Sequence, residues 1–248
     1  MKHRFTFPEL VIISGISLLA AALLIPTLGA AGKKARTLAC TEKQQNLYKG
    51  FAAYCSDNDN LLPDGAQLDR RSKDGWWNKL YPYTRDNHLS RCPDAADPDN
   101  GPAIITFYTG PEGKYLKYAK ASIAYNSQLG AGNNGGTVSS SGHGLGYPKQ
   151  IKKVTDLNKP PLLFADITAQ VSILPGDNRQ DQLNGSSPAA PGTFAARHLG
   201  KGNIIFTDGH AEALSGPELW QKAETAYNAS AKRTGTAFPV MNYFLTGQ

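Results

Sequence analysis

The sequence predicts an α+β fold in which a long N-terminal helix packs on an antiparallel β-sheet with long loops. An apolar run over residues 10–32 holds no charged side chain, and helical periodicity continues beyond it to about residue 56. The rest of the chain alternates short β-prone segments with turns rich in glycine, proline, asparagine and aspartate. These observations favour one long rod followed by a globular domain.

The apolar run, at about 1.5 Å per helical residue, is long enough to cross a bilayer core. It exceeds the roughly 7–15 apolar residues of a signal peptide, although Leu28-Gly29-Ala30 keeps a cleaved signal peptide as an alternative. The prediction therefore divides the chain into a short basic leader (1–4), a long helix (5–56) and an exported globular domain (57–248). Residues 5–32 form the membrane and assembly half of that helix.

Helical spacing marks the second half of the rod. Leu47, Phe51, Tyr54 and Cys55 recur at positions that form one apolar face. Pro26 interrupts the first half and predicts a kink or local melting, because proline removes a backbone hydrogen bond. The acidic residues that follow carry calcium-type oxygen ligands but miss the EF-hand spacing, so a turn that ends the helix is the better interpretation of Asp57, Asp59 and Asp64.

Strands are predicted over residues 104–108, 122–126, 162–166, 171–174, 203–207 and 210–214. The last two flank Asp208-Gly209, a dipeptide typical of two-residue hairpin turns. A helix capped by Ser215, with Pro217 in its first turn, follows and ends near residue 227. Glycine- and serine-rich stretches predict mobile loops over residues 130–146 and 176–192.

Composition excludes some classes of function. The net charge of +6 is modest, and no basic patch interleaved with aromatics is present, which argues against nucleic-acid binding. Cys40, Cys55 and Cys92 allow one disulfide and one leftover thiol, and the absence of a CxxC pair argues against a zinc site. Aromatic residues beyond the rod are interpreted as core rather than as a carbohydrate platform: Trp76, Trp77 and Tyr81.

The start of the chain resembles a known signature. FTFPEL followed by a long apolar helix is similar to the amino terminus of type IV prepilins and type II secretion pseudopilins. The likeness continues, in order, through ACTEKQQNLYKGFAAYCSDNDNLLPDG, WWNKLYPY, LSRCP, ASIAYN, PPLLFAD and RHLGKGNIIFTDGHAE. This ordered set resembles one pseudopilin-like family, named for a histidine, nine residues and Asp-Gly, here His198 and Asp208-Gly209.

The resemblance implies a pilin-like fold and a structural function without catalysis. The chain would be a subunit of a type II secretion or type IV pilus-like filament, single-pass in the inner membrane, with an exported domain. A prepilin peptidase would cut between Arg4 and Phe5, although pilins usually carry glycine before the cut. Glu9 would then meet the terminal amine of a neighbouring subunit, which explains a carboxylate beside an apolar run and fixes the register.

Other residues gain an expected role from the same resemblance. Pro26 falls where many pilins keep a proline that melts the helix on assembly, so Phe5, Glu9 and Pro26 are the expected assembly residues. Cys40 and Cys92 occupy family positions and form the preferred disulfide, with Cys55 as an alternative partner for either. The partners implied are copies of the chain, the membrane, the peptidase and the assembly machinery.

One constellation could hold a divalent cation, with calcium preferred: Asp166, His198, Asp208 and His210. Turn chemistry explains Asp208-Gly209 without a metal, so a structural role is the simpler interpretation. The alternative function is a singly anchored, exported binding or metal-dependent hydrolytic domain that uses these four residues.

Overall fold

A long helix and a five-stranded sheet organise the computed structural model of the chain, which describes residues 6–65, 73–86, 91–95, 103–109, 114–126, 129–130, 153–157, 159–168, 172–173, 180–183, 193–229 and 244. The helices are α1 (Phe7–Asp57), α2 (Trp76–Thr84), the one-turn α3 (Gln180–Leu183) and α4 (Gly216–Asn228), with a 3-10 turn at Val154–Asp156. The strands are β1 (Ala103–Thr109), β2 (Lys114–Ala121), β3 (Ile123–Asn126), β4 (Leu162–Asp166), β5 (Ser172–Ile173), β6 (Gly202–Phe206) and β7 (Ala211–Leu214).

The main sheet has the strand order β5-β3-β4-β6-β7. Four neighbours, β3, β4, β6 and β7, pair antiparallel, whereas the short β5 lies parallel to β3 at the edge. A separate antiparallel pair joins β1 to β2. The predicted α+β class with an antiparallel sheet is confirmed for this four-stranded part.

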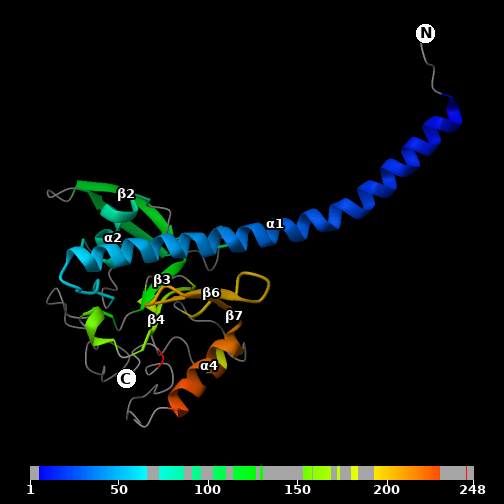
Figure 1. Cartoon of the computed structure of the whole chain (residues 1–248). Helices are drawn as coiled ribbons and strands as arrows, with labels where there is room; N and C mark the ends of the chain where they lie inside the picture. Colours follow the sequence, from blue (N-terminus) through cyan, green and yellow to red (C-terminus); the bar gives the residue numbers. More distant parts are fainter. Residues whose placement is uncertain are drawn as a thin grey trace.

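Helices cover both faces of the main sheet (Figure 1). On one face, Ile123, Tyr125 and Phe164 pack with side chains of α1 and α2. On the other face, residues such as Ala124 and Ile204 pack with α4. Alternate strand residues point to opposite faces, so Ile123 and Ala124 serve different cores.

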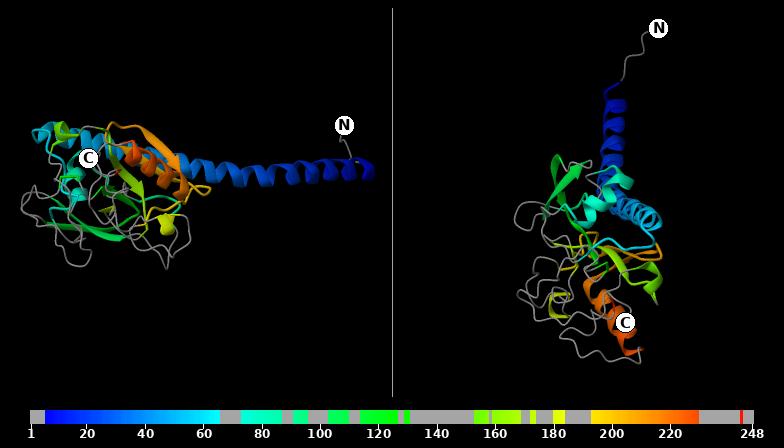
Figure 2. Two further views of the ribbon diagram at one scale, coloured as in Figure 1. Left: turned by 90° about the horizontal axis from the view of Figure 1, so that it is seen from below. Right: turned by 90° about the vertical axis from the view of Figure 1, so that its left-hand side faces the viewer.

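The helix α1 is 51 residues long and has two halves with different surroundings. Every described side chain from Phe7 to Arg36, which we call the free half, is exposed to solvent. Burial begins at Cys40 and recurs at Gln44, Leu47 and Phe51 in the packed half, residues 37–57. Figures 1 and 2 show the free half extending away from the sheet toward the N-terminus. The helix is continuous through Pro26, and Figure 1 shows a gradual curve along it rather than a break.

One prediction about this helix is wrong. Among the residues that the structure describes, no helix is both long enough and apolar enough to cross a bilayer. The membrane half predicted at residues 5–32, and the single-pass inner-membrane location drawn from it, are corrected accordingly. Ser14, Gly15 and Ser17 interrupt the apolar side chains of this half.

The predicted strands agree with β1, β3, β4, β5, β6 and β7 within one or two residues at each end, and the helix predicted after Ser215 is α4. The hairpin predicted around Asp208-Gly209 is present, with Gly209 at φ 89°, but four residues and not two connect its strands. The turn predicted after α1 is also present, since the Asn60 N–H donates to the Cys55 carbonyl at 2.9 Å. Trp76 and Trp77 are buried in the core, as expected.

Three elements were not expected: α2, β2 and the short α3, the last within a predicted loop. The leader 1–4 and Phe5 lie outside the described residues, as does the predicted loop 130–146 apart from its first residue.

Candidate functional site

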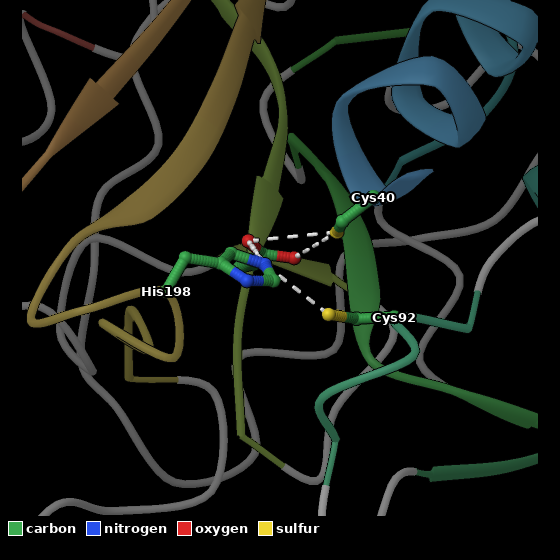
Figure 3. A group of neighbouring side chains, drawn as sticks. Cys40, Cys92 and His198 are labelled. Carbon is green, nitrogen blue, oxygen red and sulfur yellow. Dashed lines mark hydrogen bonds and ion pairs between the residues drawn. The ribbon is translucent and has the colours of Figure 1, made fainter. Parts of the chain in front are cut away.

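Four buried side chains from distant parts of the chain converge beside α1. These are Cys40, Cys92, Asp166 and His198, and each offers one ligand atom within 4.8 Å of all the others. Figure 3 shows both sulfur atoms and the imidazole turned toward a common point. None of the four residues is more than 4% exposed.

Helix α1 and a short turn provide the two sulfur atoms. Cys40 is the first buried residue of α1 and therefore marks the position where the helix meets the globular domain. Cys92 opens a turn in which the Ala95 N–H donates to the Cys92 carbonyl at 3.1 Å. The Cys92 N–H donates in turn to the Ser122 hydroxyl at 2.7 Å, which ties this turn to the start of β3.

The sheet provides the other two groups. Asp166 is the last residue of β4, and its backbone carbonyl accepts from the Ala195 N–H at 2.8 Å. His198 exchanges two backbone hydrogen bonds with Lys201 across Leu199 and Gly200, both of which have positive φ. Such a tight turn fixes the histidine backbone immediately before β6.

The polar atoms of these side chains lie 3.3–3.9 Å apart. His198 Nε2 lies 3.3 Å from Asp166 Oδ2 and 3.3 Å from Cys92 Sγ. Cys40 Sγ lies 3.4 Å from Asp166 Oδ1 and 3.9 Å from Oδ2. The carboxylate of Asp166 therefore bridges the histidine and Cys40.

A second layer of polar groups orients this cluster. His198 Nδ1 lies 3.0 Å from Asp94 Oδ2, and Arg36 approaches the other oxygen of Asp94 at 3.5 Å. Asp166 also accepts from the Asn203 backbone N–H at 2.9 Å and from Gln44 Nε2 at 3.3 Å. Hydrogen bonds to both oxygens fix the plane of the Asp166 carboxylate.

These contacts displace the pKa values of the cluster in opposite directions. The Cys40 thiol donates to Cys92 and, together with the His198 contact, lowers the pKa of Cys92 to about 6 against the effect of burial. The hydrogen bond between these two thiols, together with burial and the Asp166 charge, raises the pKa of Cys40 far above its usual range. Burial alone would lower the pKa of His198, but Asp166 and Cys92 together raise it to about 10.

The predicted metal residues divide into two separate pairs. Asp166 and His198 lie in the cluster, whereas Asp208 and His210 lie at the exposed β6–β7 turn. There His210 Nδ1 is 2.5 Å from Asp208 Oδ1, and the imidazole stacks on Phe206. The predicted set of four is therefore not brought together, because the hairpin extends its tip away from the end of β4.

The two cysteines are the residues that sequence reasoning left out of the metal set. They were expected to form a disulfide, yet Cys40, Cys55 and Cys92 are all free thiols. Cys40 and Cys92 are neighbours, as that expectation required, but they are not joined by a disulfide. Their sulfur atoms contact Asp166 and His198. In the sequence, each of the four residues lies in one of the ordered family-like segments, namely LAC, RCP, FAD and RHLG. No local ligand spacing linked them.

Part of the cluster has the order of a nucleophile, a base and an orienting acid: Cys92, His198 and Asp94. A catalytic thiol must reach its substrate, however, and Cys92 has no exposed surface. The Asp166 carboxylate also lies against the imidazole nitrogen that faces the sulfur. This arrangement suits binding or cross-linking of segments better than turnover.

The predicted assembly residue Glu9 lies at the opposite end of α1. Its Oε2 accepts from both the Thr6 N–H and the Thr6 hydroxyl at 2.7 Å, which forms a capping box at the helix start. The Thr6 backbone bond, followed by the hydroxyl bond, lowers the pKa of Glu9. No bond to Oε1 is present among the described residues, so one oxygen of this exposed carboxylate can accept a further donor.

Comparison with models of protein families, with curated proteins and with solved structures gave no match to this chain.

Proposed function

We propose that the chain is a structural subunit of a pilus-type or secretion-type filament, in which copies pack through the free half of α1. The observation that carries this proposal is the exposure of large apolar side chains on a helix that extends from its own domain. Phe7 is 81% exposed, Leu18 is 72% and Leu19 is 69%. Exposing this much apolar surface to water is unfavourable, at about 25 cal/mol per Å².

The distribution of these side chains favours several neighbours rather than one. Successive helical residues differ by about 100°, so the exposed residues of the free half lie on all sides of the axis. They are Phe7, Leu10, Val11, Ile12, Ile13, Ile16, Leu18 and Leu19. A single partner helix would cover one stripe, whereas a bundle of copies surrounds the whole helix.

Glu9 gives that bundle a register. In a single chain its carboxylate is exposed and caps the first turn through one oxygen. In the assembly proposed, a cation of the next subunit binds the other oxygen, and the resemblance to pilins implies that the cation is a terminal amine. A subunit docked at the wrong height would leave the carboxylate unpaired among apolar side chains. A processing peptidase and assembly machinery are the further partners that this function requires.

Assembly is tested by placing the same charge on each half of α1 in the full chain. Ile16→Glu introduces a carboxylate into the free half, and we expect it to abolish oligomers detected by crosslinking and by sedimentation. Gln45→Glu adds the same charge to an exposed position of the packed half and is the matched control. Oligomers that survive Ile16→Glu, or that are lost equally in both variants, would overturn assembly through the free half.

The role of Glu9 is separated from helix capping by a second pair of variants. Glu9→Gln keeps a side chain that can cap the helix but removes the charge, so we expect it to weaken assembly. Thr6→Ala removes the hydroxyl bond to Glu9 and keeps both the backbone N–H bond and the carboxylate, so we expect it to assemble. The reverse pattern would show that Glu9 acts only within its own helix.

A further inference from the structure

We propose that Cys40, Cys92, Asp166 and His198 bind one zinc ion, which joins α1 to the globular domain at the position where the free half ends. The proposal does not depend on filament assembly. It concerns a site inside a single chain, and it corrects the earlier preference for calcium.

The donor set selects the class of metal. Thiolate sulfur and imidazole nitrogen are ligands of zinc and of neighbouring transition metals, while calcium and magnesium take oxygen ligands. A structural zinc ion takes four ligands. The cluster offers four, namely two sulfurs, one nitrogen and one carboxylate oxygen. On binding, each thiol and the imidazole nitrogen lose any proton they carry to solvent, and each forms a bond to the metal.

Three of the six separations between the ligand atoms are close to those of tetrahedral coordination. Zinc bonds of about 2.0–2.3 Å place neighbouring ligand atoms of a tetrahedron roughly 3.3–3.8 Å apart. The observed separations are 3.3 Å from His198 Nε2 to Asp166 Oδ2 and 3.3 Å from the same nitrogen to Cys92 Sγ. Cys40 Sγ lies 3.9 Å from Asp166 Oδ2. All four ligand atoms lie within 4.8 Å of one another, so a metal ion would need to draw them together by only a short distance.

The surrounding groups match those of a metal site. A ligating histidine commonly bonds through its other nitrogen to a carboxylate, and Asp94 occupies that position at 3.0 Å from Nδ1. The Asn203 side-chain nitrogen is buried and has no acceptor in the structure.

Two arrangements without metal compete with this proposal. In the first, a protonated His198 binds Asp94 and Asp166, but its single Nε2 proton would be shared by two acceptors, each at 3.3 Å. In the second, Cys40 and Cys92 form a disulfide, which would leave Asp166 and His198 without the sulfur contacts they make now. A zinc ion satisfies all four groups at once.

The site has the properties of a structural rather than a catalytic metal centre. Catalytic zinc keeps an open position for water or substrate, whereas here four protein ligands are available and all of them are buried. The ligands come from α1, the turn at residues 91–95, the end of β4 and the turn before β6. A metal at this position would fix the start of the packed half relative to the sheet.

The experiment measures metal binding by the full chain, purified under reducing conditions and stripped of metal by a chelator. Zinc is titrated against a competing chromophoric chelator, and cobalt is used separately as a spectroscopic probe. We expect about one zinc per chain and, with cobalt, the charge-transfer absorption of a tetrahedral thiolate complex. We expect zinc binding to weaken by more than about 100-fold in each of three variants: Cys40→Ser, Cys92→Ser and His198→Ala. This exceeds the loss typical when a residue that only hydrogen-bonds a metal ligand is replaced.

Two further variants keep the test independent of folding. Asp94→Asn leaves all four ligands in place and should weaken zinc binding by about 10–100-fold. Cys55→Ser removes the third buried thiol, which lies outside the cluster, and should leave binding unchanged. The proposal is overturned if the folded, reduced chain takes up no zinc at micromolar concentration, or if Cys55→Ser weakens binding as much as Cys40→Ser. It is also overturned if protein isolated without reductant contains a Cys40–Cys92 disulfide in place of zinc.

Discussion

The free and packed halves of α1 belong to one continuous helix, yet their apolar residues face different surroundings. In the packed half, Leu47 and Phe51 recur on one face and contact the sheet, while the exposed positions are polar apart from Leu38 and Ala52. In the free half, apolar residues lie on every side and contact no other part of the described chain closely enough to be buried. The packed half is therefore explained by its own domain, and under the proposed function copies of the chain would cover the free half.

The cluster of Cys40, Cys92, Asp166 and His198 lies at the boundary between these halves. Among the described side chains of α1, Cys40 is the buried one nearest to the free half. One helical turn earlier, Arg36 is 64% exposed but still reaches Asp94. The free half therefore joins the globular domain next to this cluster.

The largest expected effect comes from truncating one leucine in each half. Leu47 is 3% exposed in the core, so Leu47→Ala should lower the free energy of unfolding by about 2–5 kcal/mol through lost contacts and a cavity. Leu19 is 69% exposed, so Leu19→Ala should change it by no more than about 0.5 kcal/mol. Urea denaturation followed by circular dichroism measures both, at a concentration at which the chain is monomeric.

The same two variants should reverse their order in an assembly assay, where Leu19→Ala loses oligomers and Leu47→Ala retains them in its folded fraction. A Leu19→Ala variant that unfolds as easily as Leu47→Ala would show that the free half folds back on its own domain, and the comparison would fail.

The sequence predicted the fold well where local chemistry determines it. Strand β4 has the predicted bounds, residues 162–166, and the β6–β7 hairpin follows from Asp208-Gly209. Strand β2 was not predicted, since its lysines at 114, 117 and 120 recur every three residues and hide the alternation expected of a strand. Helix α2 contains Pro82 near its end, and its aromatic residues gave a burial prediction but no helical pattern.

The site was predicted only in part. Asp166 and His198 were proposed as metal ligands. The family resemblance assigned Cys40 and Cys92 to a disulfide, and the lack of a CxxC pair argued against zinc. Here Cys40, Cys92, Asp166 and His198 come from four separate segments, and only the tertiary fold brings them together. No local spacing could have revealed a site of this kind.

A smaller effect is expected when an equivalent glycine in each half receives a methyl group. A Cβ atom at Gly50 would lie 2.4 Å from Thr84 Cγ2, because α1 and α2 approach closely there. Gly50→Ala should therefore destabilise the domain by about 1–3 kcal/mol in the same denaturation assay. A Cβ atom at Gly15 meets nothing within 4 Å, so Gly15→Ala should stabilise the free half by up to about 1 kcal/mol through helix propensity. Hydrogen exchange of the amides at residues 7–20 measures that local gain.

The steric explanation for Gly50 has its own control. Thr84→Ser removes the methyl group in question, so the double variant Gly50→Ala/Thr84→Ser should recover most of the lost stability. If the double variant is as unstable as the sum of the single variants, the cost at Gly50 has another origin, and the close approach of α1 to α2 does not determine it.

The smallest difference is expected between the two capping boxes. Ser215 accepts from the Glu218 N–H and donates its own N–H to Glu218 at 2.7 Å, at the start of a helix whose Leu219 and Ala223 are buried. Ser215→Ala should lower the free energy of unfolding by about 1 kcal/mol, because α4 unfolds together with the core. Thr6→Ala removes an equivalent cap from the free half, where the first turn can fray without exposing any core, so global unfolding should change by no more than a few tenths of a kcal/mol. Equal losses in the two variants would mean that α1 melts as one unit along its whole length. The free half would then be a cooperative part of the domain and not an independent arm offered to neighbouring molecules.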